Sequence, residues 1–192
     1  MGITTENFFE NIYQVIFTPK EFFEKEEQTI SIRLALCTII SITIFTQISK
    51  AILNSELTNW FFIFSLIGSI IGSILIWFLS GLFFEFIAKI FNQEGKLQQI
   101  LCLFAYAQVP IIFFAPLNLM KKIGDLGYLL STNAEVLLYF WIIALYALSL
   151  KNTYKLTYAR AFMLIFLPFI STFLALYWLG CFLFNIGYIF SI

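Results

Sequence analysis

Five stretches of this sequence are long, apolar and almost free of charged residues. A helix needs about 20 apolar residues to cross the roughly 30 Å of hydrocarbon in a bilayer. The five predicted crossings are residues 32–53, 60–84, 97–120 and 134–150, and a last one that starts after Arg160 and runs to Ile192. Of the 192 residues, 61% are hydrophobic and only 11% are charged, against about 25% charged residues in soluble domains. We therefore predict an all-α, polytopic membrane bundle of five transmembrane helices.

The ionisable composition argues against enzymatic chemistry. The chain contains no histidine, which removes any imidazole base or imidazole metal ligand, and Asp125 is its only aspartate, so a pair of catalytic aspartates is excluded. No glycine-rich phosphate loop, HExxH or CxxC motif is present. Cys37, Cys102 and Cys181 lie far apart inside apolar runs and are interpreted as packing residues. We expect no catalytic residue, no metal site and no cofactor.

The residues before the first crossing predict two short helices at the membrane surface. Residues 1–17 place apolar side chains opposite acidic and amide ones, as in an amphipathic helix lying on lipid or on the bundle. The segment 18–21, Thr-Pro-Lys-Glu, combines an N-cap threonine with proline at the first helical position and a capping glutamate. It predicts a second helix over residues 19–27, with Phe22 and Phe23 facing the membrane.

The distribution of lysine and arginine predicts the orientation. Cytoplasmic loops carry an excess of these residues. If the N-terminus is cytoplasmic, that side carries eight of them, against three on the other side (Lys50, Lys121 and Lys122). We predict a cytoplasmic N-terminus and an outside C-terminus. Residues 1–30 then form a cytoplasmic region of amphipathic helices, and residues 31–192 form the transmembrane domain.

Two glutamates border the crossings. Glu85 lies 25 residues after Trp60, which is about 37 Å along a helix, so it is predicted at the cytoplasmic end of a long second crossing. Lys89, four residues later, is expected to form an interfacial ion pair with it, with a functional contact to a headgroup or ion as the alternative. Residues 132–135, Thr-Asn-Ala-Glu, repeat the helix-start pattern, and Glu135 is interpreted as the capping residue of the fourth crossing.

Small and polar side chains occur inside the first three crossings. Gly68 and Gly72 form a G-x-x-x-G pattern, interpreted as a close helix contact within the chain, with dimerisation as the alternative. The midplane hydroxyl and amide groups are expected to form hydrogen bonds between helices, with a polar path for a small solute or ion as the alternative. These groups belong to Thr43, Thr46, Gln47, Ser69, Ser73 and Gln108.

Prolines interrupt two of the predicted crossings. Pro110 and Pro116 lie in the third and Pro168 in the fifth, and each removes a backbone hydrogen bond and kinks or ends a helix. The freed carbonyls must find other partners, and Tyr106 and Gln108 are placed to supply them. Since a broken helix can also mark a binding site, residues 106–110 are candidate functional residues.

Several loose motifs together resemble a known family over nearly the whole chain. The resemblance rests on the proline-containing turn at 17–23, a glycine loop at 94–96, Ala-Tyr-Ala-Gln-Val-Pro at 105–110, Trp141, and Tyr-Ala-Arg-Ala at 158–161, which includes Arg160. With five crossings, these features resemble the Yip-one family of Ypt/Rab-interacting, five-pass membrane proteins. The resemblance implies the same N-inside, C-outside topology and a non-enzymatic membrane-organising or adaptor function.

The resemblance also bears on partners and location. Eukaryotic members are implied to act in ER–Golgi trafficking by binding prenylated small GTPases and partner Yip proteins through a long polar N-terminal region. Only about 30 residues precede the first crossing here, which argues against small-GTPase binding. The compact form resembles bacterial relatives and implies a bacterial cytoplasmic membrane. The expected partners are the lipid bilayer and other membrane proteins, and the net charge of 0 argues against nucleic acid. The alternative function is a small channel, transporter subunit or lipid scramblase.

Overall fold

The computed structural model describes residues 5–24, 31–54, 60–90 and 96–190, and every regular element within them is a helix. Five apolar segments are long enough to cross a membrane, as predicted: Ile32–Leu53, Trp60–Ile90, Leu97–Ile123, Asp125–Tyr154 and Tyr158–Phe182. The helices are α1 (Thr5–Phe17), α2 (Pro19–Glu24), α3 (Ile32–Asn54), α4 (Trp60–Ile90), α5 (Leu97–Ala107), α6 (Phe114–Met120), α7 (Asp125–Tyr154) and α8 (Tyr158–Phe190), with the 3-10 helices η1 (Val109–Phe113) and η2 (Lys121–Ile123).

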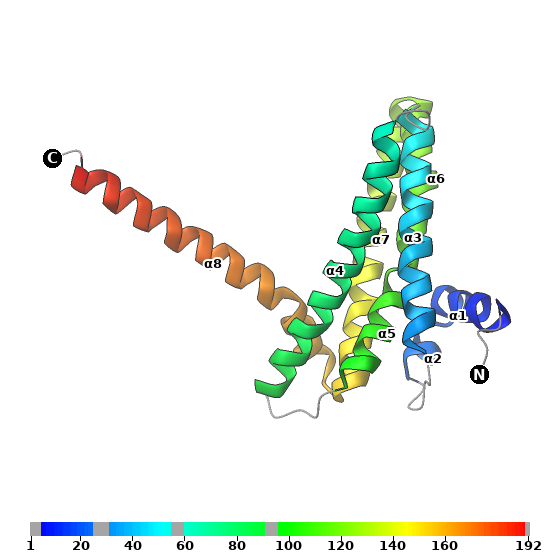
Figure 1. Cartoon of the computed structure of the whole chain (residues 1–192), viewed down its shortest axis with the longest axis horizontal. Helices are drawn as coiled ribbons and strands as arrows, with labels where there is room; N and C mark the ends of the chain where they lie inside the picture. The colour runs from blue at the N-terminus through cyan, green and yellow to red at the C-terminus, as the bar shows by residue number, and fades with distance from the viewer. Residues whose placement is uncertain (1–4, 25–30, 55–59, 91–95, 191–192) are drawn as a thin grey trace.

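Figure 1 shows α3, α4, α5 with α6, and α7 standing side by side as a bundle, while α8 projects away from it. Helix α1 lies across one flank of the bundle and α2 lies near one end, which we call the α2 end. Helix α5 forms the centre, because it packs against α3, α4 and α7, and residues 100–107 are all buried. The third crossing is therefore the core helix, and the others keep a face for lipid.

The N-terminal helices pack onto this core. Helix α2 starts at Pro19, as predicted, and the Thr18 hydroxyl donates to the Gln14 carbonyl at 3.4 Å. The prediction that Phe22 and Phe23 face the membrane is wrong: both are buried in one cluster with residues of α1, α3, α5 and α7. Amphipathicity gives the apolar face of a helix but does not say whether lipid or protein covers it. The predicted residues 1–4 of the first helix and 25–27 of the second lie outside the described residues.

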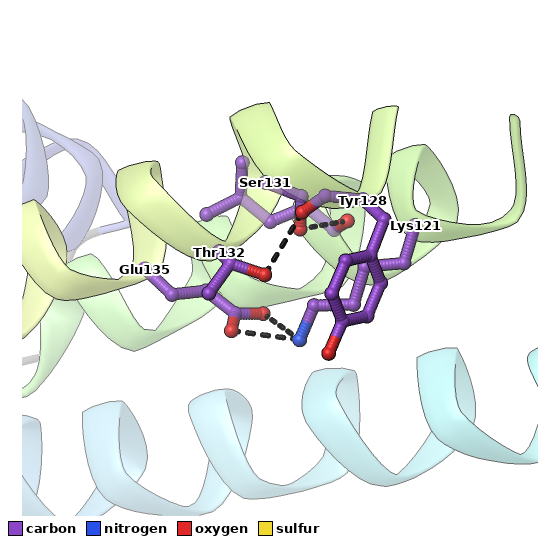
Figure 2. A network of polar contacts seen from close by, with 6 residues as sticks. Lys121, Tyr128, Ser131, Thr132 and Glu135 are labelled. Atoms are coloured by element: carbon purple, nitrogen blue, oxygen red, sulfur yellow. Dashed lines mark hydrogen bonds and ion pairs between the residues drawn. The ribbon is translucent and has the colours of Figure 1, made fainter. Parts of the chain in front are cut away.

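The fourth crossing begins nine residues earlier than predicted, at Asp125 rather than 134. Gly124, with φ of 111°, directly precedes this start and takes a left-handed conformation that favours glycine. The capping prediction for Glu135 is therefore wrong. Inside the helix, the Thr132 hydroxyl donates to the Tyr128 carbonyl at 2.8 Å, one turn back, as Figure 2 shows. The hydroxyl of a serine or threonine can donate to the carbonyl one turn back inside a helix, and it can also cap the start of a helix. The pattern at 132–135 therefore does not by itself fix where the helix begins.

The three prolines have different effects. The third crossing breaks at Gln108, just before Pro110, as predicted. Pro116 is the third residue of α6, in the first turn of that helix, where proline is tolerated, and it does not break the helix. Helix α8 continues through Pro168, and the Ser171 and Thr172 hydroxyls donate to the carbonyl of this proline.

The prediction that Gly68 and Gly72 form a close helix contact within the chain is wrong, because a different glycine of α4 makes that contact. A Cβ atom built at Gly68 or Gly72 would meet nothing within 4 Å, so these glycines make no close contact with another helix that the structure describes. The close approach occurs at Gly81, where a Cβ would lie 2.4 Å from Cδ2 of Leu101 on α5. Helix α4 is apolar all round, so its hydropathy does not show which face meets a neighbour. Dimerisation through Gly68 and Gly72 stays a prediction.

Hydrogen bonds between α3 and α4 agree with the expectation for four of the midplane polar groups, whereas the Thr46 hydroxyl donates to carbonyls of its own helix. The Thr43 hydroxyl donates to the Ser73 hydroxyl at 3.0 Å, and the Gln47 amide donates to the Ser69 hydroxyl at 2.6 Å. Such bonds between membrane helices contribute about 0.6–1.7 kcal/mol each. They join α3 to the half of α4 that lies away from the α2 end.

Candidate functional site

A cavity of about 620 Å³ lies inside the bundle and extends from Gln108 toward the end opposite α2. We call it the Gln108 cavity. Its walls come from α3, α4, η1, α6, η2 and α7, so all four bundled crossings contribute. Its polar lining residues are Thr46, Ser49, Lys50, Gln108, Asn118, Lys121, Glu135, Tyr139 and Tyr146, and its apolar ones are Leu53, Ile76, Ile111, Phe114, Ala115 and Ile142.

The break in the third crossing places Gln108 at the inner end of this cavity. Because Pro110 has no N–H, the chain continues as the 3-10 helix η1, and the Ile111 N–H donates to the Gln108 carbonyl at 2.9 Å. The Gln108 carbonyl at the break therefore has a backbone partner. The Gln108 side chain is instead a hydrogen-bond partner of the Tyr146 hydroxyl on α7.

Tyr106 does not line the cavity. It is fully buried on the α2 side of Gln108, and its hydroxyl accepts a hydrogen bond from the Asn11 amide of α1 at 3.1 Å. Phe104 is also buried there and packs edge-on against Phe84 and Tyr146, with ring centroids 5.4 and 4.8 Å apart. The core helix on the α2 side of Gln108 is thus closely packed.

An ion pair lies in the wall of the cavity at the end opposite α2. The Lys121 ammonium is 2.6 and 2.7 Å from the two carboxylate oxygens of Glu135, and both side chains are partly buried (Figure 2). Ser131, one turn before Glu135, donates to the Leu117 carbonyl at 2.9 Å and joins α7 to α6. Lys50, also in the lining, has no carboxylate within 4 Å among the described residues.

A second polar cluster lies at the α2 end. Glu85 is only 6% exposed, and the Tyr154 hydroxyl donates to its carboxylate at 2.9 Å. The predicted pairing with Lys89 is present at 3.6 Å, but Glu85 is buried under α7 rather than at an open interface. Sequence reasoning missed Tyr154, because the predicted fourth crossing stopped at residue 150. The extra turn of α7 carries this tyrosine.

Replacing Tyr154 with phenylalanine is expected to lower the free energy of unfolding by about 1.5–3 kcal/mol, because a buried carboxylate loses its hydroxyl donor. The measurement is the thermal unfolding midpoint of the detergent-solubilised protein. Tyr128→Phe, at an exposed tyrosine of the same helix, is the control and should leave the midpoint unchanged. In a Glu85→Leu background the Tyr154 substitution should have a much smaller effect, and an equal effect in both backgrounds would show that the bond contributes nothing.

Two further contacts fix the ends of helices near this cluster. The ammonium nitrogen of Lys151 on α7 lies 3.2 Å from a carboxylate oxygen of Glu24 on α2. The same nitrogen lies 4.3 Å from the ring centroid of Tyr158. Arg160, at the start of α8, is exposed and lines a cavity of about 420 Å³ between α4, α7 and α8. Arg160 and Gln108 therefore line different cavities. Glu85 is close to the Arg160 cavity, because its hydrogen-bond partner Tyr154 lines that cavity.

The chemistry available in the Gln108 cavity is hydrogen bonding and charge attraction. It offers two ammonium groups, one carboxylate that is already paired, and several amide and hydroxyl groups. Among the described residues no group of three or more carboxylate, thiolate or imidazole side chains could hold a metal ion. These groups suit the binding of a polar or charged ligand.

Comparison with curated proteins and with solved structures gave no match. A family model described as the Yip1 domain matches residues 13–179, which reach from α1 into α8 and include the Gln108 cavity and the Glu85 cluster. This match covers far more than half of the sequence and agrees with the resemblance inferred from its motifs. The chain belongs to the Yip1 domain family of membrane proteins.

Proposed function

We propose that this Yip1-family protein is a non-enzymatic, membrane-organising adaptor that presents a docking platform, made of α1 and α2, to partner proteins. The charge bias of the loops predicts that this platform faces the cytoplasm. The observation that carries the proposal is that α1 and α2 are fastened to the transmembrane core while a line of aromatic side chains on α1 stays exposed.

The fastening has an apolar and a polar part. Val15, Phe22 and Phe23 are buried in the cluster that also contains Tyr106 of the core helix. The Asn11 amide donates to the Tyr106 hydroxyl at 3.1 Å. Buried aromatic side chains contribute large apolar contact areas, so these contacts hold the platform in a defined position.

The exposed face of α1 is suited to binding in an apolar groove of a partner protein. Phe9, Tyr13 and Phe17 follow one another at four-residue spacing, so they share one face of α1, and each is more than half exposed. Exposed acidic side chains, Glu10 and Glu21, lie nearby in the sequence. An amphipathic helix of this kind binds an apolar groove through such anchors, and a basic rim would complement the glutamates.

A photo-reactive amino acid placed at Tyr13 tests the proposal in intact membranes. We expect discrete crosslinks to protein, because the side chain points away from the core. The same amino acid at Leu137, an exposed position in the middle of α7, is the control and should label lipid. If Tyr13 labels only lipid, α1 is a membrane anchor and the adaptor proposal fails.

The second candidate function is the handling of a small solute or lipid, and the Gln108 cavity is the observation that favours it. The packed residues on the α2 side of Gln108 argue against a continuous pore. Flux and lipid scrambling in proteoliposomes test this function directly. A Gln108→Leu variant with unchanged transport would remove Gln108 from such a mechanism.

A further inference from the structure

We propose that the Gln108 cavity binds the phosphate-bearing headgroup of an anionic membrane lipid, which enters sideways between α4 and α7. This proposal concerns the end of the bundle opposite to the α1–α2 platform and does not depend on the adaptor function.

The charge of the lining favours an anion. Lys121 and Glu135 neutralise each other in a close ion pair, and Lys50 remains as an unpaired cation among the described residues. A lone ammonium at the wall of a partly apolar cavity attracts an anion more strongly than it would in water. The phosphate of a lipid headgroup carries the opposite charge and can form a charge-assisted hydrogen bond with such an ammonium group.

Hydrogen-bond donors without a protein partner lie in the same lining. Within the part of the chain that the structure describes, the Asn118 amide and the Tyr139 hydroxyl make no hydrogen bond. Together with Lys50 they offer donors from α3, α6 and α7. Oxygen atoms of a phosphate group accept hydrogen bonds from such donors, and charge-assisted bonds are the stronger kind.

The apolar part of the lining favours a lipid over a free anion. Ile76 of α4 and Tyr139 of α7 line the cavity and are yet 70% and 58% exposed, so the cavity opens sideways at their level. Glu135 and Tyr146 are 11 residues apart, which places about 16 Å of α7 along the cavity. With the headgroup near Lys50, the acyl chains of the lipid would leave the cavity between α4 and α7 and lie across Ile76.

Native mass spectrometry of the full chain in a neutral detergent tests the proposal, with phosphatidylglycerol, phosphatidylcholine and inorganic phosphate as separate probes. We expect one phosphatidylglycerol per chain, retained about fivefold or more in preference to phosphatidylcholine, since one lysine near an anionic headgroup contributes about that factor. Inorganic phosphate alone should not be retained and should not displace the lipid.

Two variants locate the binding. Lys50→Gln should weaken phosphatidylglycerol retention about fivefold, whereas Lys20→Gln, at an exposed lysine near the α2 end, should leave it unchanged. Ala115→Leu, which adds volume to the cavity wall without changing charge, should abolish retention while phosphatidylcholine remains unbound. An unchanged elution profile and thermal midpoint show that each variant is folded.

Three outcomes would overturn the proposal. Equal retention of phosphatidylglycerol and phosphatidylcholine would exclude recognition of the anionic headgroup. Retention or competition by inorganic phosphate at the same concentration would identify a free anion as the ligand. Unchanged lipid retention by both folded variants would place the lipid elsewhere. Failure of the Tyr13 crosslinks would leave all three readouts unaffected, so the two proposals are distinguishable.

Discussion

Replacing Phe22 with alanine is expected to lower the free energy of unfolding by about 3–5 kcal/mol and to detach α1 and α2 from the bundle. The Phe22 side chain is 1% exposed, and its ring lies 5.2 Å from the rings of both Phe23 and Tyr106. Truncation leaves a cavity between α2 and the core helix. Since α2 has only six residues, it has little helical stability of its own once this contact is lost.

Hydrogen exchange is the measurement that separates local detachment from global unfolding. Amides of α1 and α2 should lose most of their protection in Phe22→Ala, while those of α5 should lose no more than the decrease in global stability. Phe9→Ala, at an exposed position of α1, is the control and should change the stability by less than about 0.5 kcal/mol. Unchanged exchange in α1 and α2 would show that Phe22 does not hold the platform. If the adaptor proposal is right, Phe22→Ala should also reduce the protein crosslinks from Tyr13.

The five crossings could be predicted because the signal is local. The thickness of the bilayer sets a minimum length for each apolar run, and residues 32–53 agree with the structure at both ends. The start of α2 was predicted for the same reason, since Pro19 acts on its own turn. Two local sequence patterns indicate different starts for α7. The glycine at position 124 fixes the start, while the pattern at 132–135 lies inside the helix.

Side-chain contacts between distant residues could not be predicted from hydropathy. Lipid and protein core are both apolar, so the pattern does not say which of them covers Phe22. The candidate site shows the same limit. Gln108 was predicted as a candidate because it lies just before the helix break at Pro110, and a broken helix can mark a binding site. The sequence places Lys50 and Glu135 near the ends of crossings. It does not show that the fold brings both of them into the lining of the Gln108 cavity.

Replacing Gly81 with leucine is expected to lower the free energy of unfolding by about 3 kcal/mol, the upper end of the usual cost of overpacking. Even a Cβ at this position would lie 2.4 Å from Leu101 Cδ2 and 3.9 Å from Leu97 Cδ1. The Leu101 side chain is 2% exposed, and a leucine at position 81 would add three carbon atoms beyond Cβ to this buried contact. We expect helix α4 to move away from the core helix, which would loosen the contact that also positions the Glu85–Tyr154 bond.

Gly68→Leu is the matched control, because it makes the same chemical change in the same helix. Both substitutions raise helix propensity by the same amount, about 1 kcal/mol, so this gain cancels in the comparison. A Cβ at Gly68 meets nothing within 4 Å, and the thermal midpoint of Gly68→Leu in detergent should equal or exceed that of the unaltered protein. If instead Gly68→Leu is the less stable variant, or if it changes the oligomeric state, then Gly68 faces a second copy of the chain. The dimerisation alternative for the G-x-x-x-G pattern would then hold, and the close contact at Gly81 would be the weaker of the two.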